Sequence, residues 1–255
     1  MRNDILKQLC ENSRYLDKLY YDFENNIRNE LYSACQFKLA ARSNQTEGNT
    51  LTEEDTATLF DTQMIPSTKY KPREIEEAQG HFLMFNGMLK TIDSQLNIDI
   101  IKSFHKQLTQ GIYEFKSNGG EPGSFKTRTN IAGTSKTSDP KSVENELNSL
   151  LDIYYNNNDI TFDSIEQKLA WFHSKYEHIH PFQDYNGRTG RMILFRESLL
   201  ANKPIIINNI DKAEYINALK YAHDNDDTKE SCDRLAELLI KWKNETVEEL
   251  KIFIE

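Results

Sequence analysis

Apolar residues recur every three or four positions along most of the chain, which is the spacing of amphipathic helices. The first such stripe starts at Leu16 and continues through Phe23 and Ile27 to Leu31, and it predicts one long helix. Gly48 interrupts the pattern a little further on. The same spacing returns in later segments, at 75–89, 98–108, 143–154, 165–176, 192–199, 215–222 and 235–242. We therefore expect an all-α protein.

One segment departs from this helical pattern. Residues 118–138 are rich in Gly, Thr and Ser and contain an Ala-Gly step between two runs of extended character. Such a composition is typical of short strands joined by a turn. We expect a short β-hairpin, or flap, that projects from the helical body.

Length and composition limit the organisation and the class of protein. A chain of 255 residues can bury one sizeable core, and we expect an N-terminal helical segment, 1–70, packed on a core formed by 71–255. No window of roughly 18 residues is apolar enough for a membrane span, and the polar start does not resemble a secretory signal. We expect a cytoplasmic protein that does not bind membranes.

Charge and cysteine content argue against two kinds of site, a general nucleic-acid surface and a cysteine metal site. The net charge of −9 argues against general nucleic-acid binding, because such a surface repels phosphates. The three cysteines, Cys10, Cys35 and Cys232, lie far apart and lack the spacing of metal ligands. We expect them to be buried free thiols.

Candidate chemistry is concentrated in the segment HPFQDYNGRTGR at 180–191. Proline disfavours helical backbone at the residue before it, so one helix should end near His180 and the next should begin after the Asn-Gly turn. Unpaired N–H groups at a helix start attract phosphate. Arg188 and Arg191, three residues apart, project from one helical face toward the same anion. The segment is suited to binding a phosphate group.

Two further side chains in the segment add reactive groups. His180 is able to take up a proton near neutral pH, as a general base does. Asp184 offers the hard oxygen ligands that Mg²⁺ prefers. A base, a magnesium ligand and paired arginines so close together indicate a phosphoryl or nucleotidyl transfer site.

These residues resemble the Fic family signature, HxFx(D/E)GNGRxxR. The matching positions are His180, Phe182, Asp184, Asn186, Gly187, Arg188 and Arg191. The resemblance implies a Fic-type helical core, with the signature loop between two helices. It also implies ATP as co-substrate, Mg²⁺ as cofactor and a protein hydroxyl as the acceptor of AMP.

The resemblance also implies a role for each residue of the segment. His180 would be the general base, Asp184 would hold Mg²⁺, and Phe182 would anchor the loop in the core. The nucleotide phosphates would be bound along the turn and first helical residues, namely Asn186, Gly187, Arg188, Thr189, Gly190 and Arg191. Arg191 would reach the γ-phosphate.

Two other regions resemble parts of the same family that border the nucleotide. The predicted hairpin resembles the flap that pairs with the backbone of the target protein. Its residues nearest the nucleotide would be Asn130, Ile131, Ala132 and Gly133. The segment AEYINALKYAH resembles the region beside the adenine, so Tyr215 is a candidate base contact, with a place in the core as its alternative.

The chain departs from the family pattern at Tyr185, where glycine is usual. The backbone N–H survives this change, so anion binding is compatible with it. Tyrosine is strained if the position requires φ > 0. The departure puts in question the details of phosphate binding and the choice of donor nucleotide.

The N-terminal segment SNQTEGN, 43–49, resembles the Fic inhibitory motif, (S/T)xxxE(G/N). The resemblance implies an N-terminal inhibitory helix. Glu47 would form a bidentate pair with Arg191 in place of the γ-phosphate. Ser43, on the same helical face, would steady the glutamate through a hydrogen bond.

We therefore predict a protein adenylyltransferase that releases pyrophosphate and is inhibited by Glu47. Three alternatives stay open: transfer of another nucleotide or phosphate group, removal of AMP from a modified target, and a nucleotide-sensing module without catalysis. The inhibitory motif within the chain argues against a toxin held by a separate antitoxin. Self-modification and a homo-oligomer also stay open, and the target protein is not specified.

Other candidate sites are weaker. His178 and His180 form a His-x-His pair without an evident third ligand, so we expect no further metal site there. The acidic run Asp224, Asp226 and Asp227 lacks the glycine and the distal glutamate of a calcium loop. It indicates a solvated turn.

Overall fold

The computed structural model describes residues 14–65, 69–132, 135–156 and 160–254. Within these ranges the α-helices are α2 (Arg14–Glu24), α3 (Leu31–Thr46), α4 (Glu53–Thr62), α5 (Pro72–Lys90), α6 (Ile98–Thr109), α7 (Tyr113–Ser117), α8 (Val143–Asn156), α9 (Ile165–Ile179), α10 (Asn186–Leu200), α11 (Lys212–Asp224) and α12 (Asp233–Leu250). Short 3₁₀ turns are η1 (Asn209–Asp211), η2 (Glu230–Cys232) and η3 (Lys251–Phe253). The all-α prediction is confirmed.

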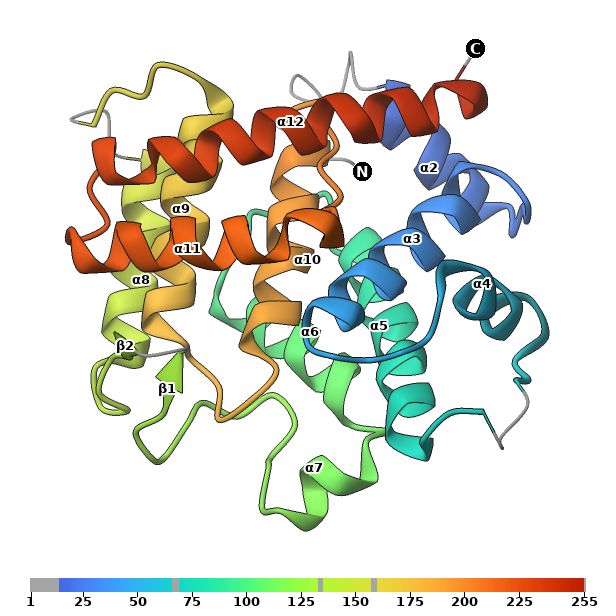
Figure 1. Ribbon diagram of the computed structural model, residues 1–255, viewed down its shortest axis with the longest axis horizontal. Coiled ribbons are helices and arrows are strands. Elements are labelled where there is room, and N and C mark those ends of the chain that lie inside the picture. The colour runs from blue at the N-terminus through green and yellow to red at the C-terminus, as the bar shows by residue number, and fades with distance from the viewer. Residues whose placement is uncertain (1–13, 66–68, 133–134, 157–159, 255) are drawn as a thin grey trace.

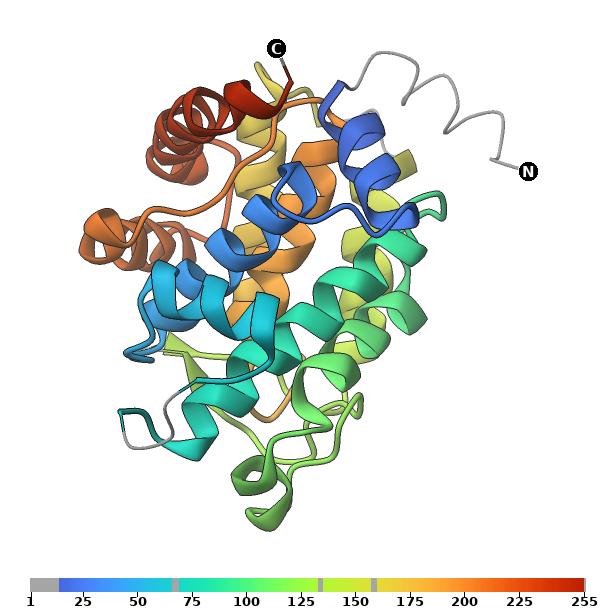
Figure 2. The same ribbon diagram turned by 90° about the vertical axis from the view of Figure 1, so that its right-hand side faces the viewer.

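The helices are arranged around α10, which runs through the middle of the molecule (Figure 1). Helix α9 packs against α10 on one side and carries α8 on its outer face, while α5 and α6 contact α10 from the other side. Helix α12 crosses α9 and contacts α11. Seen from the side, α5 and α6 lie together, across the molecule from α11 and α12 (Figure 2). The loop that joins α9 to α10 is therefore enclosed by helices from both halves of the chain.

Local sequence signals set where several helices begin. The residues before α4, α6 and α9 are Thr52, Asn97 and Ser164, and each side-chain oxygen accepts a hydrogen bond from the backbone N–H three residues on. These bonds satisfy N–H groups that have no partner within the helix. Helix α5 starts with Pro72, whose fixed φ suits the first helical position.

The single helix expected from Leu16 to Leu31 is wrong. Helix α2 ends at Glu24 and α3 begins at Leu31. Between them Asn26 and Asn29 have φ values of 50° and 62°, and this left-handed backbone ends a helix. Both helices bury their apolar residues in one core, which is why the spacing continues across the break.

The projecting flap expected over 118–138 is not seen in the described part of that segment, where only a short pair of strands is formed. The strands there are β1 (Ile131–Ala132) and β2 (Ser135–Lys136), two residues each, paired antiparallel. In the described remainder of the segment no further ladder is formed, and Lys126 is bonded to the end of α9 and to the loop that follows it. Lys126 donates from its backbone N to Pro181 O at 2.9 Å and from its side chain to Ile179 O at 3.0 Å.

One apolar core joins the N-terminal helices to the rest of the protein. It includes Leu19 of α2, Leu39 of α3, Phe85 of α5 and Phe195 of α10.

Two of the three cysteines, Cys35 and Cys232, are buried and free, as predicted, whereas Cys10 lies outside the described residues. Among the described helices, none combines the length and the apolarity needed to cross a membrane.

The close contact of α5 with α6 depends on a glycine. A Cβ added at Gly80 would lie 2.0 Å from the carbonyl oxygen of Leu108 in α6. Gly80→Ala should therefore force the helices apart and lower the free energy of unfolding by about 1–3 kcal/mol, as overpacking does. Gly111 has no atom within 4 Å of the same position and is the matched control. Urea unfolding midpoints compare the two variants, and equal midpoints would contradict the packing argument.

Candidate active site

The loop between α9 and α10 is closed by the side chain of Asn186. Its Oδ1 accepts from the backbone N of Phe182 at 2.7 Å, and its Nδ2 donates to Phe182 O at 2.8 Å. Helix α9 ends at Ile179, so the predicted stop before Pro181 is confirmed. His180 follows in left-handed backbone with φ 51°. The loop thus has a fixed shape before any ligand enters.

A second histidine, which the sequence analysis missed, supports this loop from α6. The ring of His105 stacks on Phe182 with centroids 3.8 Å apart. Its Nδ1 accepts from Gly123 N at 2.9 Å, so its Nε2 carries the hydrogen and donates to Asp184 O at 3.2 Å. Burial lowers the pKa of His105 to about 3 and keeps the ring neutral. Nothing local in the sequence marks His105, because it occupies a buried helix position like its apolar neighbours.

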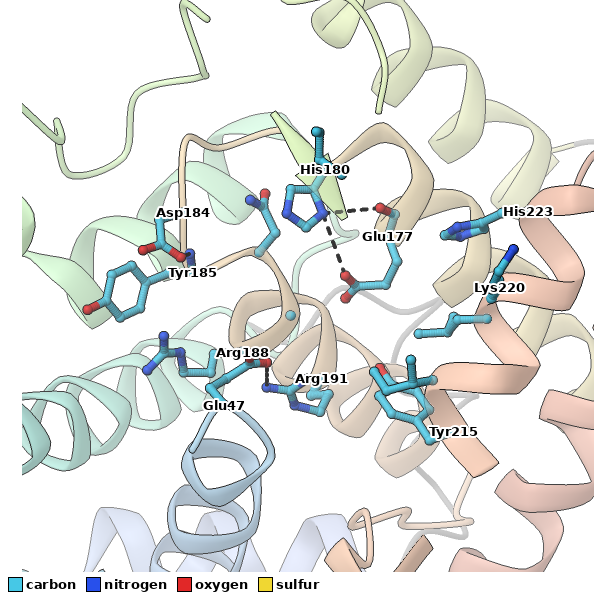
Figure 3. A pocket seen from close by; sticks show the side chains of 15 residues that line it. Glu47, Glu177, His180, Asp184, Tyr185, Arg188, Arg191, Tyr215, Lys220 and His223 are labelled. Carbon is cyan, nitrogen blue, oxygen red and sulfur yellow. Dashed lines mark hydrogen bonds and ion pairs between the residues drawn. The ribbon is translucent and has the colours of Figure 1, made fainter. Parts of the chain in front are cut away.

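A cavity of about 400 Å³ opens above the start of α10 (Figure 3). The predicted site residues that line it are Glu47, Ile131, His180, Asp184, Asn186, Gly187, Arg188, Arg191 and Tyr215. Tyr215 is buried, and its hydroxyl lies 2.7 Å from His173 Nε2. The structure therefore brings together residues from α3, the loop, α10 and α11 that are far apart in the sequence.

Several predicted nucleotide-binding residues do not line this cavity. Thr189 is buried and donates to Tyr185 O at 2.9 Å, and Gly190 faces Glu177 and Tyr176. Asn130 donates to Phe182 O at 2.9 Å instead of facing the cavity. The side chains of Thr189 and Asn130 thus serve the shape of the loop, and Gly190 leaves room for Glu177 and Tyr176.

The structure describes the remaining residues of the predicted hairpin only in part. Ala132 is paired with Ser135 in the short hairpin, and Ile131 is 67% exposed and lines the cavity. Gly133 lies outside the described residues. The structure thus brings one residue of the predicted hairpin set, Ile131, to the cavity.

Arg191 is held by the N-terminal helix α3. Its Nη2 donates to Glu47 Oε1 at 2.6 Å and to Ser43 O at 3.0 Å, and its Nε donates to Ser43 Oγ at 3.0 Å. The expected bidentate pair is thus a single contact, and Ser43 bonds to Arg191, not to Glu47 as expected. Burial acts to raise the pKa of Glu47, but the charges of Arg191 and Arg188 outweigh it and lower that pKa. Glu47 is therefore an anion facing the cavity.

Arg188 is held in the same way by a residue that the sequence analysis missed. Its Nη1 lies 3.0 Å from Glu77 Oε1 of α5, and both side chains are buried. Glu77 also accepts from Arg73 Nε at 2.9 Å and from Asn49 Nδ2 at 3.1 Å. Burial acts to raise the pKa of Glu77, yet Arg188 and the hydrogen bonds lower it. Both arginines of the segment are thus paired with carboxylates from N-terminal helices.

Tyr185 adopts left-handed backbone with φ 64°, the conformation that is strained for tyrosine. Its side chain is buried, and its hydroxyl donates to Glu77 Oε1 at 3.1 Å. Its ring lies under the Arg188 guanidinium, 4.0 Å from Cζ, and meets Phe115 edge-on at 5.3 Å. A left-handed non-glycine residue costs roughly 1–2 kcal/mol. The buried ring offsets this cost through packing and the cation–π contact.

His180 lies at the cavity rim with a defined tautomer. Its Nδ1 donates to Glu177 O at 3.2 Å, since a carbonyl oxygen only accepts, and Nε2 keeps its lone pair. Burial lowers the pKa of His180 to about 4, so the ring is neutral at pH 7. Asp184, by contrast, is exposed at the cavity, and within the described chain no lysine or arginine pairs with it. An exposed carboxylate that lines the same cavity as Arg188 and Arg191 is suited to holding a divalent ion together with a phosphate.

Glu177 is a further cavity residue that the sequence analysis missed. It lies one turn before His180 on α9, and Figure 3 shows it between His180 and Arg191. Among the described residues its buried Oε1 has no hydrogen-bond partner. Burial raises the pKa of Glu177 to about 7. Besides Glu47 and Asp184, the cavity thus contains a third carboxyl group.

Comparisons with known proteins agree with this geometry. Residues 95–196 match the Fic/DOC family. The chain is 28% identical to protein adenylyltransferase fic-1 of Caenorhabditis elegans over 183 residues, which is 69% of this chain and 34% of that protein. It is 25% identical to protein adenylyltransferase Fic of Nematostella vectensis over 193 residues, 74% of this chain and 44% of that one. The match thus spans less than half of each relative.

Solved structures share the fold over most of the chain. A Fic-domain-containing signalling protein from Bacteroides thetaiotaomicron has a TM-score of 0.70 at 21% identity, over 94% of this chain and 98% of that chain. Fic-1 of C. elegans has a TM-score of 0.70 at 20% identity, over 97% of this chain and 72% of that chain. The segment 180–191 lies within the matched family region. The region 95–196 thus matches the Fic/DOC family, and the chain is a distant homologue of protein adenylyltransferase Fic.

Proposed function

We propose that this chain is a protein adenylyltransferase that transfers AMP from ATP to a Ser, Thr or Tyr hydroxyl of a protein, and that Glu47 inhibits it. The observation that carries the proposal is the 2.6 Å contact between Arg191 Nη2 and Glu47 Oε1, at a cavity that His180 and Asp184 also line. The names of the two relatives support the same reaction class.

The acceptor hydroxyl is activated by His180. The lone pair on Nε2 takes the hydroxyl proton as the oxygen attacks the α-phosphorus of ATP, and pyrophosphate leaves on the opposite side. Because Nδ1 is bonded to Glu177 O, the ring keeps this orientation. A neutral ring at pH 7 means that the base is ready without prior loss of a proton.

The phosphates bind at the start of α10, because the first backbone N–H groups of a helix lack partners within it and attract anions. A Cβ at Gly187 would lie 2.7 Å from Glu47 Oε1 and 2.9 Å from Arg191 Nη1. Glycine is therefore needed for anions to approach the helix end closely. Arg188 and Arg191 supply the positive charge that stabilises the triphosphate.

Asp184 is the residue suited to hold Mg²⁺. When bound, the ion would supply Lewis-acid stabilisation of the charge that develops on pyrophosphate. The contact between His105 Nε2 and Asp184 O fixes the backbone at this position.

Inhibition follows from competition for one guanidinium. Glu47 occupies the side of Arg191 that a γ-phosphate needs, and its negative charge repels that phosphate. ATP then binds with its phosphates displaced from in-line geometry, and a displacement of about 1 Å lowers the rate on the order of 10²-fold.

Residues 1–70 form the regulatory segment and 71–255 the catalytic core in this proposal. Its partners are ATP and a protein target, which includes the chain itself if it modifies itself.

The assay that tests the proposal measures label transfer from α-labelled ATP to protein by wild type and Glu47→Gly. We expect transfer and self-modification to rise by about 10²-fold in the variant, while ATP affinity measured by calorimetry changes less. Glu47→Gln, which keeps the shape but not the charge, should give an intermediate rise. Ser43→Ala should release the enzyme partly, because it loosens Arg191 and leaves Glu47 in place.

The same assay run in reverse separates the remaining functions. If Glu47 instead positions a water that removes AMP from a modified target, Glu47→Gly abolishes removal without raising transfer. If wild type and Glu47→Gly both bind ATP but label no protein, the chain is a nucleotide sensor. If label is transferred only from another nucleotide, that nucleotide is the donor. Unchanged rates in both directions would reject inhibition by Glu47.

His180 should act as a neutral base with a low pKa. In a histidine NMR titration its ring resonances should show no midpoint between pH 5.5 and 8, because burial lowers the pKa of His180 to about 4. In the Glu47→Gly background, His180→Ala should lower the transfer rate by roughly 10²–10⁴-fold at unchanged ATP affinity. A midpoint near 6.5, together with full activity of the alanine variant, would exclude this role.

A further inference from the structure

Outside the proposed catalytic residues, two histidines and an aspartate from distant parts of the chain converge where α9 and α11 end. The three residues are His178 near the end of α9, His223 near the end of α11, and Asp227 just beyond it. One ligand atom from each lies within 4.8 Å of the other two. Figure 1 shows α11 crossing α9, and the two helices contact each other.

Asp227 is the centre of this cluster and is 1% exposed, so the solvated turn expected for the acidic run is wrong at this position. Asp226 and Asp227 have φ values of 61° and 46°, and Asp227 N donates to Ala222 O at 2.8 Å. This turn folds the chain back over the end of α11 and directs the carboxylate inward. Asp226 stays exposed.

The donor atoms are close to metal-binding geometry. Asp227 Oδ2 lies 2.7 Å from His178 Nδ1, and Asp227 Oδ1 lies 3.7 Å from His223 Nε2. Around Zn²⁺, with bonds of about 2.0–2.1 Å, tetrahedral donors lie about 3.4 Å apart. These two distances lie on either side of that value, and the three donor atoms lie within 4.8 Å of one another. Because His223 Nε2 lies 3.2 Å from Ser174 O, metal binding requires the His223 ring to give up this contact and turn toward the ion.

The surroundings also suit a bound ion. Ser174 Oγ donates to Asp227 Oδ1 at 2.6 Å, which is the kind of outer contact that orients a carboxylate ligand. The nearby Lys175 ammonium is bonded to Asp226 O at 2.9 Å. The side chain of His178 is 41% exposed and borders a cavity of about 490 Å³, so water has access to a fourth position.

We propose that His178, His223 and Asp227 bind one Zn²⁺ ion, with water as the fourth ligand. Two imidazoles and one carboxylate suit Zn²⁺ and disfavour Mg²⁺, which takes oxygen ligands. The site is separate from Asp184 and does not rest on the transfer reaction. It differs from the expectation of no further metal site, which considered His178 only with its neighbour His180.

The ion would clamp two walls of the main cavity together. His178 is two residues before His180, while His223 lines the cavity from α11, the helix that also carries Tyr215 (Figure 3). Holding the ends of α9 and α11 together fixes the distance between the base and the far wall. Zn²⁺ should therefore stabilise the fold as well as bind.

The test is a Zn²⁺ titration of the full chain after treatment with EDTA, using a chromophoric chelator as competitor. We expect one tight site per chain and a higher unfolding temperature with Zn²⁺, since an ion that binds only the folded state stabilises it. His178→Gln and His223→Gln should each weaken Zn²⁺ binding by at least about 100-fold, because loss of outer contacts alone costs 10–100-fold. Co²⁺ in place of Zn²⁺ should give visible ligand-field bands that both variants lose.

Two matched controls separate this site from other carboxylates. Asp226→Asn changes the exposed neighbour and should leave Zn²⁺ affinity unchanged, as should Asp184→Ala. The unfolding temperatures of metal-free variants check folding, and the half-exposed His178 is the substitution most easily tolerated. Absence of a one-to-one site, or binding that both histidine variants retain, would show that the cluster is held by hydrogen bonds alone.

Discussion

The structure depends on how the buried guanidinium of Arg191 is neutralised. Its side chain is 2% exposed, and a buried charge without a partner costs several kcal/mol. Glu47 and Ser43 supply the missing partners from α3. The contact that stabilises the N-terminal helix on the core is therefore the contact that, in the proposed function, occupies the phosphate site. In that proposal nucleotide and inhibitory helix compete because both satisfy the same cation.

The same constraint explains the departure at Tyr185. Arg188 is also buried and is neutralised by Glu77, whose carboxylate receives the Tyr185 hydroxyl as well. The tyrosine ring covers the guanidinium and fills the space beside Phe115. A residue with unfavourable backbone is thus tolerated because it belongs to a buried network of charges. In a glycine version of this loop, Arg188 would lack this aromatic cover.

Much of this could be predicted from the sequence, because helical spacing and the segment 180–191 are local signals. The break between α2 and α3 was missed, since the apolar stripe continues across it. Glu77, Glu177 and His105 were missed for a different reason. Each lies on a helix with the usual spacing of apolar residues, which does not mark it. Its contacts with the site form only where α5, α9 and α6 meet the loop. The predicted hairpin is reduced to two residue pairs, and Lys126 in the same segment is bonded to the end of α9 instead.

The central claim is that one guanidinium is shared between Glu47 and the terminal phosphate of ATP. Crystal structures of wild type and Glu47→Gly, each with Mg²⁺ and a non-hydrolysable ATP analogue, test it most directly. The account predicts Arg191 bonded to Glu47 in wild type, with the γ-phosphate turned away, and bonded to the γ-phosphate in the variant. The same phosphate position in both structures, with Arg191 still on Glu47 in wild type, would contradict it.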